Sequence, residues 1–223
     1  MIADKITEID QTLSAFFMDL RDPFAIKVFS YITAFGDATV ITALLISLIV
    51  AFATLQRWSA VIAITVAVLG NVATVVVLKS FFARPRPDFA YFIETTGSFP
   101  SGHAAISVAF YGTLALTLWR QKMIGLVVAI MAAVIMGCAI SLSRLYLVEH
   151  YLSDVVAGLL IGAMWGWIGI KVGARQHRDV TSQMLSSNRR RVAILAVIIA
   201  VLFAGYTIAT YAPPKADSDL GAN

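Results

Sequence analysis

The sequence predicts an all-α protein whose helices cross a membrane six times. Of its 223 residues, 59% are hydrophobic and only 13% are charged, and the mean hydropathy is +0.83. A soluble domain is usually about one quarter charged, so the composition alone favours a membrane protein. Several runs without any Asp, Glu, Lys or Arg approach the roughly 20 residues needed to span a bilayer. We therefore expect one membrane domain and no soluble second domain.

The chain opens with apolar residues at helical spacing, followed by Asp22-Pro23, which is expected to end a helix. This pattern predicts an amphipathic helix lying in the membrane interface, and a helix packed against the bundle explains it equally well. We assign residues 1–35 to this segment, residues 36–212 to a six-span domain and residues 213–223 to a polar tail. The apolar positions at helical spacing are Ile2, Ile6, Ile9, Leu13, Phe16 and Leu20.

Four charge-free runs are long enough for complete spans: 38–56, 58–78, 123–143 and 192–214. Two more runs, 104–119 and 155–170, are short for a span. Extending them toward the N-terminus takes in PSGH at 100–103 and HYLSD at 150–154, and each then reaches about 20 residues. Three reactive side chains are therefore expected at helix starts near one membrane boundary: His103, His150 and Asp154.

Basic residues predict the orientation of the bundle. Six spans place both termini on one side, which carries eight of the 17 Lys and Arg, against nine on the opposite side. If Lys79, Arg86 and Arg144 are there for chemistry, five Lys and Arg remain on the side of the termini, against nine on the opposite side. The positive-inside rule then makes the 171–191 loop cytoplasmic and turns the histidine-bearing end toward the periplasm or exterior of a cell (inner) membrane protein.

The same basic loop is interpreted as a topology signal that contacts anionic lipid rather than nucleic acid, because no recognition motif accompanies it. The single cysteine, Cys138, lies in an apolar run and is expected to be a packing residue.

The first polar cluster is KSFFARPRP at 79–87, which contains Lys79, Arg84 and Arg86. Its two prolines stiffen the backbone and hold an arginine in place. Snorkelling of Lys79 from a helix end is the alternative interpretation. The aromatic residues nearby are best explained as an interfacial belt, with lipid guidance as the second possibility; they are Phe81, Phe82, Phe89, Tyr91 and Phe92.

The second cluster is PSGH, residues 100–103. Ser101 is a natural helix N-cap, and Gly102 allows another group to approach the backbone closely. A helix start offers free N–H donors and a partial positive charge, which suits an anion. An ordinary cap followed by a boundary histidine is the alternative.

The third cluster is SRLYLVEHYLSD, residues 143–154. His150 and Asp154 are four residues apart, which on a helix places them on one face. A carboxylate bonded to one ring nitrogen fixes the tautomer and leaves the other nitrogen as a nucleophile. Asp154 can cap a helix at the same time.

Together the clusters supply cations for a multi-oxygen anion, one candidate nucleophile and one candidate proton donor, which is what phosphoryl transfer requires. A metal centre is the rival interpretation. The chain has only three histidines, no Asp/Glu cluster accompanies them, and His177 lies on the opposite side beside Arg178. Neither a metal nor another cofactor is therefore expected.

These residues resemble the signature of the type 2 phosphatidic acid phosphatase (PAP2) family, whose three parts are K-x6-R-P, P-S-G-H and S-R-x5-H-x3-D. Every fixed position matches in order and spacing, and the six-span layout extends the likeness over most of the chain. The matching residues are Lys79, Arg86, Pro87, Pro100, Ser101, Gly102, His103, Ser143, Arg144, His150 and Asp154.

The resemblance implies that His150 attacks phosphorus to form a phosphohistidine, that Asp154 holds His150, and that His103 protonates the leaving oxygen. It also implies the residues that bind the phosphate: Lys79, Arg86, Ser101, Gly102 and Arg144. Arg84 and Glu149 lie outside the signature and are interpreted as solvated boundary charges that tune the site.

The implied substrate is a lipid that presents its phosphate at the bilayer edge, such as phosphatidate, phosphatidylglycerol phosphate, polyprenyl diphosphate or a lipid A phosphate. A phosphotransferase that passes the group to a second lipid would use the same site. A protein that binds or flips lipids without catalysis is the alternative from another class, and the intact signature argues against it.

Overall fold

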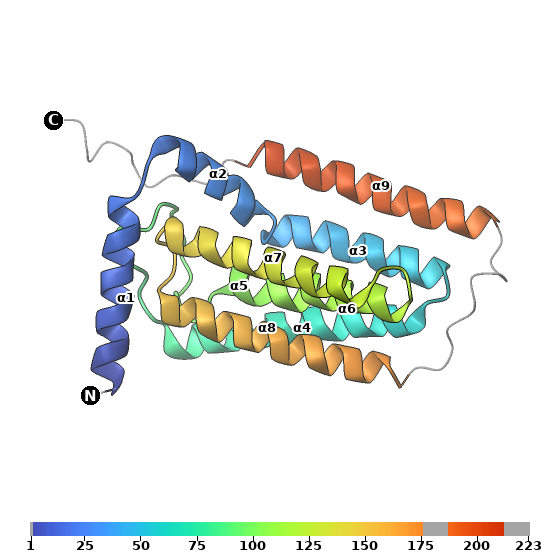
Figure 1. Cartoon of the computed structure of the whole chain (residues 1–223), viewed down its shortest axis with the longest axis horizontal. Coiled ribbons are helices and arrows are strands. Elements are labelled where there is room, and N and C mark those ends of the chain that lie inside the picture. The colour runs from blue at the N-terminus through green and yellow to red at the C-terminus, as the bar shows by residue number, and fades with distance from the viewer. Residues whose placement is uncertain (1, 176–186, 212–223) are drawn as a thin grey trace.

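The computed structural model of the chain describes residues 2–175 and 187–211, and these form helices and connecting loops without a β-strand (Figure 1). The all-α prediction is confirmed, as are six helical segments long and apolar enough to cross a membrane. His177, part of the 171–191 loop and the 213–223 tail lie outside the described residues. The six segments are Pro23–Thr54, Trp58–Phe82, Gly102–Arg120, Leu126–Tyr146, Leu152–Gly173 and Ser187–Ala209.

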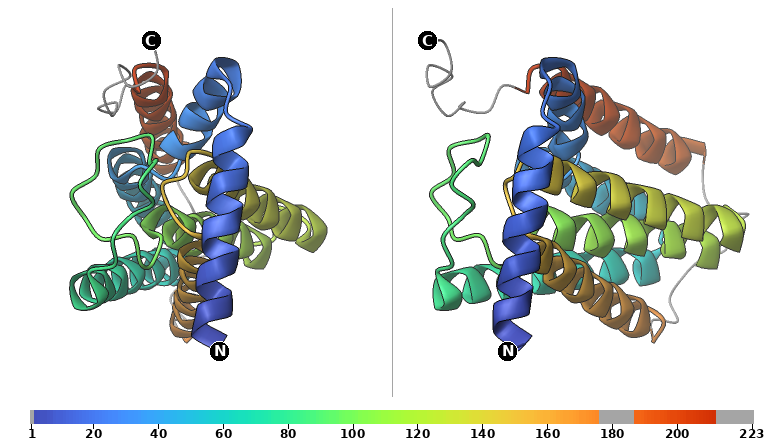
Figure 2. Two further views of the ribbon diagram at one scale, coloured as in Figure 1. Left: turned by 90° about the vertical axis from the view of Figure 1, so that its left-hand side faces the viewer. Right: turned by 60° about the vertical axis from the view of Figure 1, so that its left-hand side comes forward.

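The first helix, α1 (Ile2–Asp19), runs across one end of the bundle, crosswise to the long helices (Figures 1 and 2). It ends before Asp22-Pro23, as expected from the proline. The carboxylate of Asp22 then caps α2 (Pro23–Ala34) by accepting from the N–H groups of residues 24 and 25 at 2.9 and 3.2 Å. A short turn leads into α3 (Ala38–Thr54), so the expected domain boundary at residue 36 falls between these two helices.

Helix α4 (Trp58–Phe82) is followed by a long loop and then by three consecutive helical pieces that form one span. These pieces are α5 (Gly102–Ile106), the π-helical stretch η1 (Ser107–Gly112) and α6 (Thr113–Arg120). The bundle is completed by α7 (Leu126–Tyr146), α8 (Leu152–Gly173) and α9 (Ser187–Ala209).

Close packing of α8 fixes where the helix ends meet. Helix α8 packs against α4, α5 and η1, while α9 packs against α3. A methyl group at Gly158 of α8 would lie 2.5 Å from the carbonyl oxygen of Ser101, so only glycine allows this approach. Small residues at such crossings let helix backbones come together in a membrane. As a result, the start of α8 lies beside the start of α5.

Large apolar side chains cover the outside of the spans, as expected for a surface in contact with lipid. Val127 of α7 is 74% exposed and Leu160 of α8 is 66% exposed. Cys138 is also exposed, so the expectation that it is a packing residue is wrong; its side chain lies on the lipid-facing side of α7 instead. Among the aromatic residues near residue 85, Phe81 and Phe89 are exposed and suit an interfacial belt, whereas Phe92 is buried.

Candidate active site

The site lies where α4 and α7 end, where α5 and α8 begin, and where the loop of residues 83–101 covers this end of the bundle. Figure 2 shows that loop, in green, on the same end of the molecule as α1. An open pocket of about 380 Å³ there is lined by Lys79, residues 83–86 and residues 94–97. Lys79 lies in the last turn of α4, and its ammonium donates to the carbonyl oxygen of Gly97.

The PSGH segment forms the helix start that the sequence predicts. Ser101 is the N-cap of α5 and is fully buried, and its own N–H donates to the carbonyl oxygen of Asp154 at 3.0 Å. This bond ties the start of α5 to the first turn of α8. A methyl group at Gly102 would make only ordinary contacts with Val75 and Lys79, so packing within the protein does not require glycine there.

His103 is the second residue of α5, and its ring packs against the turn between α2 and α3. A methyl group at Gly36 would lie 2.8 Å from Cδ2 of His103, so glycine at that position leaves room for the imidazole. The Nε2 atom of His103 is buried, with no hydrogen-bond partner in the part of the chain that the structure describes. The other histidine of the site and the cations of Arg86 and Arg144 lie close enough to act on this ring electrostatically.

His150 and Asp154 lie together, although not on one helix as the spacing suggested. Helix α8 begins only at Leu152, and Asp154 is in its first turn. Nδ1 of His150 is 3.6 Å from Oδ2 of Asp154, which is longer than a hydrogen bond. The same oxygen accepts the N–H of Tyr151 at 3.0 Å. Asp154 thus caps its own helix and faces the imidazole, the double role that the sequence left open.

The backbone leading to His150 is unusual. Val148 has a φ of 54°, which is rare for a β-branched side chain and is typically found where function requires a strained conformation. Burial lowers the pKa of His150, and the positive charges of Arg144, Arg86 and Lys79 lower it further. His150 is therefore a neutral imidazole near pH 7, with a lone pair available for attack.

Arg86 and Arg144 come together on the carboxylate of Glu94, which the sequence analysis did not single out. Oε2 of Glu94 accepts from Nη2 of Arg86 at 2.8 Å, and Oε1 accepts from Nη2 of Arg144 at 3.1 Å. An anion with two oxygens therefore fits between the two guanidinium groups. Arg144 is fully buried and also donates to Oγ1 of Thr33 at 3.0 Å, which makes α2 part of the site.

Glu149 is not a solvated boundary charge, and that expectation is wrong. Its side chain is fully buried and accepts from the N–H of Phe92 at 2.6 Å, from Arg86 at 3.2 Å and from Arg144 at 3.5 Å. Burial raises the pKa of Glu149, while the nearby Arg144 charge opposes that rise. Glu149 thus holds the guanidinium groups of Arg86 and Arg144, the two arginines expected to bind phosphate.

Arg84 is not a free solvated charge either. Its guanidinium donates to Oδ1 of Asp154 at 2.6 Å and to Oδ2 of Asp10 at 2.9 Å, and it lies 4.2 Å from the ring centroid of Tyr151. The expectation of a boundary charge was wrong because the partner, Asp10, comes from the distant N-terminal helix. A signal was present in the sequence, since Asp10 is one helical turn from both Ile6 and Leu13 and so lies on the same face as these apolar residues.

Metal ligands are not clustered in the described residues. Within residues 2–175 and 187–211, no group of three or more His, Cys, Asp or Glu side chains is arranged so that it could hold a metal ion. The polar groups of the site are imidazoles, guanidinium groups, an ammonium and carboxylates paired with those cations, and this set suits an anionic ligand.

Fold and site together define a class: a multi-pass helical membrane protein whose helix ends enclose a cluster of two imidazoles, paired carboxylates and fixed cations. The sequence model of the PAP2 superfamily matches residues 58–178, more than half of the chain. The chain therefore belongs to the PAP2 superfamily, and the resemblance found in its signature is confirmed.

Two known phosphatases are similar to the chain, one over most of its length and the other over less than half. Phosphatidylglycerophosphatase B of Bacillus subtilis (strain 168) is 25% identical over 169 residues, 71% of this chain and 80% of that protein. Lipid A 1-phosphatase of Rhizobium johnstonii is 35% identical over 109 residues, 44% of this chain and 41% of that protein.

Two crystal structures share the architecture. The transmembrane PAP2-type phosphatidylglycerolphosphate phosphatase from B. subtilis superposes with a TM-score of 0.68 at 25% identity, covering 78% of this chain and 89% of that one. LpxE from Aquifex aeolicus superposes with a TM-score of 0.57 at 26% identity, covering 73% and 94%. The six-span PAP2-type helix bundle is therefore confirmed.

Proposed function

We propose that the chain is a metal-independent lipid phosphate phosphatase that works through a phosphohistidine. The observation that carries this proposal is the meeting of Arg86 and Arg144 around a carboxylate, next to the His150–Asp154 pair at the end of the bundle. A carboxylate between two guanidinium groups occupies the kind of position that two phosphate oxygens would take.

Unpartnered polar atoms at the site also support a ligand. Nε of Arg144 and Nε2 of His103 are buried without a hydrogen-bond partner among the described residues. Buried polar atoms are nearly always bonded in folded proteins, so such orphans call for a ligand or water. A phosphate ester would accept from the guanidinium, and its leaving oxygen would accept from the imidazole.

In the proposed reaction, Nε2 of His150 attacks phosphorus while Asp154 faces Nδ1. The N–P bond forms as the bond from phosphorus to the lipid oxygen breaks, and His103 gives its proton to that oxygen. Water then attacks the phosphohistidine and loses a proton to His103, and the N–P bond breaks to release inorganic phosphate. Lys79, Arg86 and Arg144 neutralise the phosphoryl oxygens throughout, with hydrogen bonds from Ser101 and Gly102 at the start of α5.

The substrate is proposed to be a phosphomonoester or terminal diphosphate of a lipid. The helix ends that form the site adjoin surfaces apolar enough to lie in a bilayer, so a lipid can present its phosphate while its tail stays in the membrane. The similar proteins support this class, since one is named for phosphatidylglycerophosphate and the other for the 1-phosphate of lipid A. Phosphatidate and polyprenyl diphosphates are the other candidates.

The decisive test is phosphate release from a panel of these four lipid phosphates by purified protein in mixed micelles. We expect turnover that survives a chelator and is blocked by vanadate. A His103→Ala protein should lose about 10²–10⁴ in rate. Normal turnover by a His150→Ala protein would overturn the mechanism, and labelled phosphate appearing on a second lipid instead of in solution would make the protein a phosphotransferase.

We also propose that this end of the bundle faces the periplasm or exterior, because five Lys and Arg remain there after Lys79, Arg86 and Arg144 are set aside, against nine on the other side. The test uses a Cys138→Ala background, which removes the only cysteine. A membrane-impermeant maleimide should label Thr95→Cys in intact cells and Lys122→Cys only after lysis. The opposite labelling pattern would reverse the orientation.

A further inference from the structure

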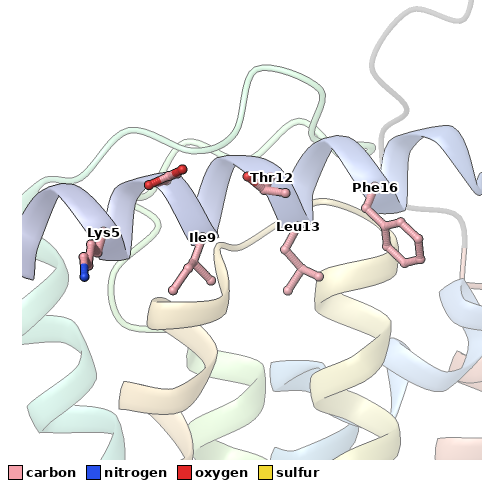
Figure 3. A pocket seen from close by; sticks show the side chains of 6 residues that line it. Lys5, Ile9, Thr12, Leu13 and Phe16 are labelled. Carbon is pink, nitrogen blue, oxygen red and sulfur yellow. The ribbon is translucent and has the colours of Figure 1, made fainter.

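Helix α1 carries a buried carboxylate beside exposed apolar side chains. Ile9 is 54% exposed and Phe16 is 53% exposed, whereas Asp10 is only 1% exposed. Figure 3 shows Ile9, Leu13 and Phe16 on one side of α1, lining a hollow beside the ends of the bundle. The interfacial interpretation explains the apolar side chains. It does not explain why α1 also buries an aspartate, since a buried carboxylate is costly unless it is paired.

The oxygens of Asp10 are bound by groups at the start of α8. Oδ1 accepts the N–H of Ser153 at 3.0 Å, and Oδ2 accepts the hydroxyl of Ser153 at 2.5 Å. Ser153 is in the first turn of α8, where N–H groups have no partner within their own helix. Asp10 therefore caps α8 from another helix, and its negative charge lies at the favourable end of that helix's dipole.

Asp10 also reaches the carboxylate beside the nucleophile through one arginine. Nη2 of Arg84 donates to Asp10 at 2.9 Å, while Nη1 donates to Oδ1 of Asp154 at 2.6 Å and to the hydroxyl of Ser153 at 2.8 Å. The guanidinium is thus held at both ends. Nη2 is bound to Asp10 of α1. Nη1 is bound to the oxygen of Asp154 that does not face Nδ1 of His150.

We propose that Asp10 is a positioning residue for catalysis, which holds Arg84 and Ser153 so that Asp154 keeps its orientation toward His150. This inference rests on the proposed phosphatase function. Without Asp10, Arg84 has only Asp154 and Ser153 left as acceptors and is free to draw Oδ1 toward the pocket, which turns Oδ2 away from the imidazole. The N-terminal helix then takes part in the chemistry although it touches neither the phosphate nor the reacting nitrogen.

The test compares Asp10→Asn with Glu8→Gln, a matched loss of one carboxylate from an exposed position of α1. We expect Asp10→Asn to lower kcat about tenfold or more with KM within twofold, because a misplacement of about 1 Å in a catalytic group can cost about 10²-fold in rate. Glu8→Gln should match the wild type. Melting temperatures of all proteins show whether the loss reflects unfolding; a fall in kcat that disappears when rates are expressed per folded protein would refute the proposal.

A double-mutant cycle separates positioning from general support of the fold. If Asp10 acts through Arg84, then Asp10→Asn should add little to the loss caused by Arg84→Gln. Effects of the two substitutions that multiply in the double variant would overturn the inference. Wild-type kinetics for Asp10→Asn would also overturn it while leaving the proposed function intact, whereas absence of wild-type turnover would refute the proposed function itself.

A readout that needs no substrate completes the test. In protein labelled with [15N]histidine, the ring signals of His150 are assigned by their loss in His150→Ala. They should shift in Asp10→Asn and remain in place in Glu8→Gln. Unshifted signals in Asp10→Asn would show that Asp154 keeps its position without Asp10 and would refute the inference, whatever the substrate is.

Discussion

Replacing Glu94 with glutamine should strengthen the binding of phosphate-like anions. Each oxygen of Glu94 accepts from one of the two arginines proposed to bind phosphate, at 2.8 Å from Arg86 and 3.1 Å from Arg144. A phosphate group needs the same donors, so it must displace this carboxylate. Glutamine retains the length of the side chain and removes its charge.

The magnitude follows from those two contacts. A hydrogen bond to a charged group contributes about 1.5–3 kcal/mol when it is buried. The side chain of Glu94 is 32% exposed, so solvent screening reduces each contact to roughly half of that or less, and glutamine keeps part of the remainder. We expect a net change of about 1–2 kcal/mol, which corresponds to about 5–30-fold in an inhibition constant at 1.36 kcal/mol per decade.

The assay is inhibition of phosphate release by vanadate, supported by calorimetric titration with inorganic phosphate. Thr95→Ala serves as the control, because it changes the neighbouring residue of the pocket wall and leaves the carboxylate in place. The inhibition constant should fall in Glu94→Gln and stay the same in Thr95→Ala. An unchanged or higher constant in Glu94→Gln would mean that the carboxylate does not compete with phosphate for these arginines.

Three further outcomes follow from the structure. Gly36→Ala should lower kcat about 10–100-fold, because its methyl group would lie 2.8 Å from Cδ2 of His103 and displace the ring; normal kcat would show that the ring can adjust. Gly158→Ala should destabilise the protein by about 1–3 kcal/mol and lower its melting temperature, because the methyl group would meet the backbone oxygen of Ser101; an unchanged melting temperature would contradict the close packing. Because burial and nearby cations lower the pKa of His150, the acidic limb of the kcat/KM profile, corrected for the second phosphate ionisation near pH 6, should have its midpoint below pH 6.5. An acidic limb with its midpoint above pH 6.5 would contradict a lowered pKa of His150.

The six spans could be predicted because charges are nearly absent from them, but their ends could not be found in the same way. Helix α4 continues past residue 78 to Phe82, and α7 continues past residue 143 to Tyr146. In both cases the charge-free run stops at a charged residue of the last turn, Lys79 or Arg144. These charges lie within the helices because each has polar partners in the site, and the sequence does not reveal such partners.

The residues of the signature could be predicted as a group, whereas their supporting partners could not. Glu94, Glu149 and Asp10 are acidic residues that the sequence analysis left aside or interpreted as solvated, yet each contacts an arginine of the site. Their arginine partners lie 5 to 74 positions away along the chain, so no single local spacing predicts the pairing. For Glu149, the signal was a carboxylate beside a reactive histidine in a largely apolar chain, where an ionisable residue is expected to be functional.

Charge balance explains why these carboxylates accompany the cations. The resting cluster contains four cations, of Lys79, Arg84, Arg86 and Arg144, and four carboxylates. Its formal charge is therefore 4 − 4 = 0, and a neutral cluster limits the energetic penalty of burial. A phosphate dianion would change that sum to 4 − 4 − 2 = −2 if Glu94 stayed in place, and to 4 − 3 − 2 = −1 if Glu94 moved into solvent. Of the four carboxylates, only Glu94 combines partial exposure with a position on the open pocket, whereas Asp10, Glu149 and Asp154 are buried. We therefore expect Glu94 to be the anion that leaves when phosphate binds, and the three buried carboxylates to remain and hold Arg84, Arg86 and Arg144 in place.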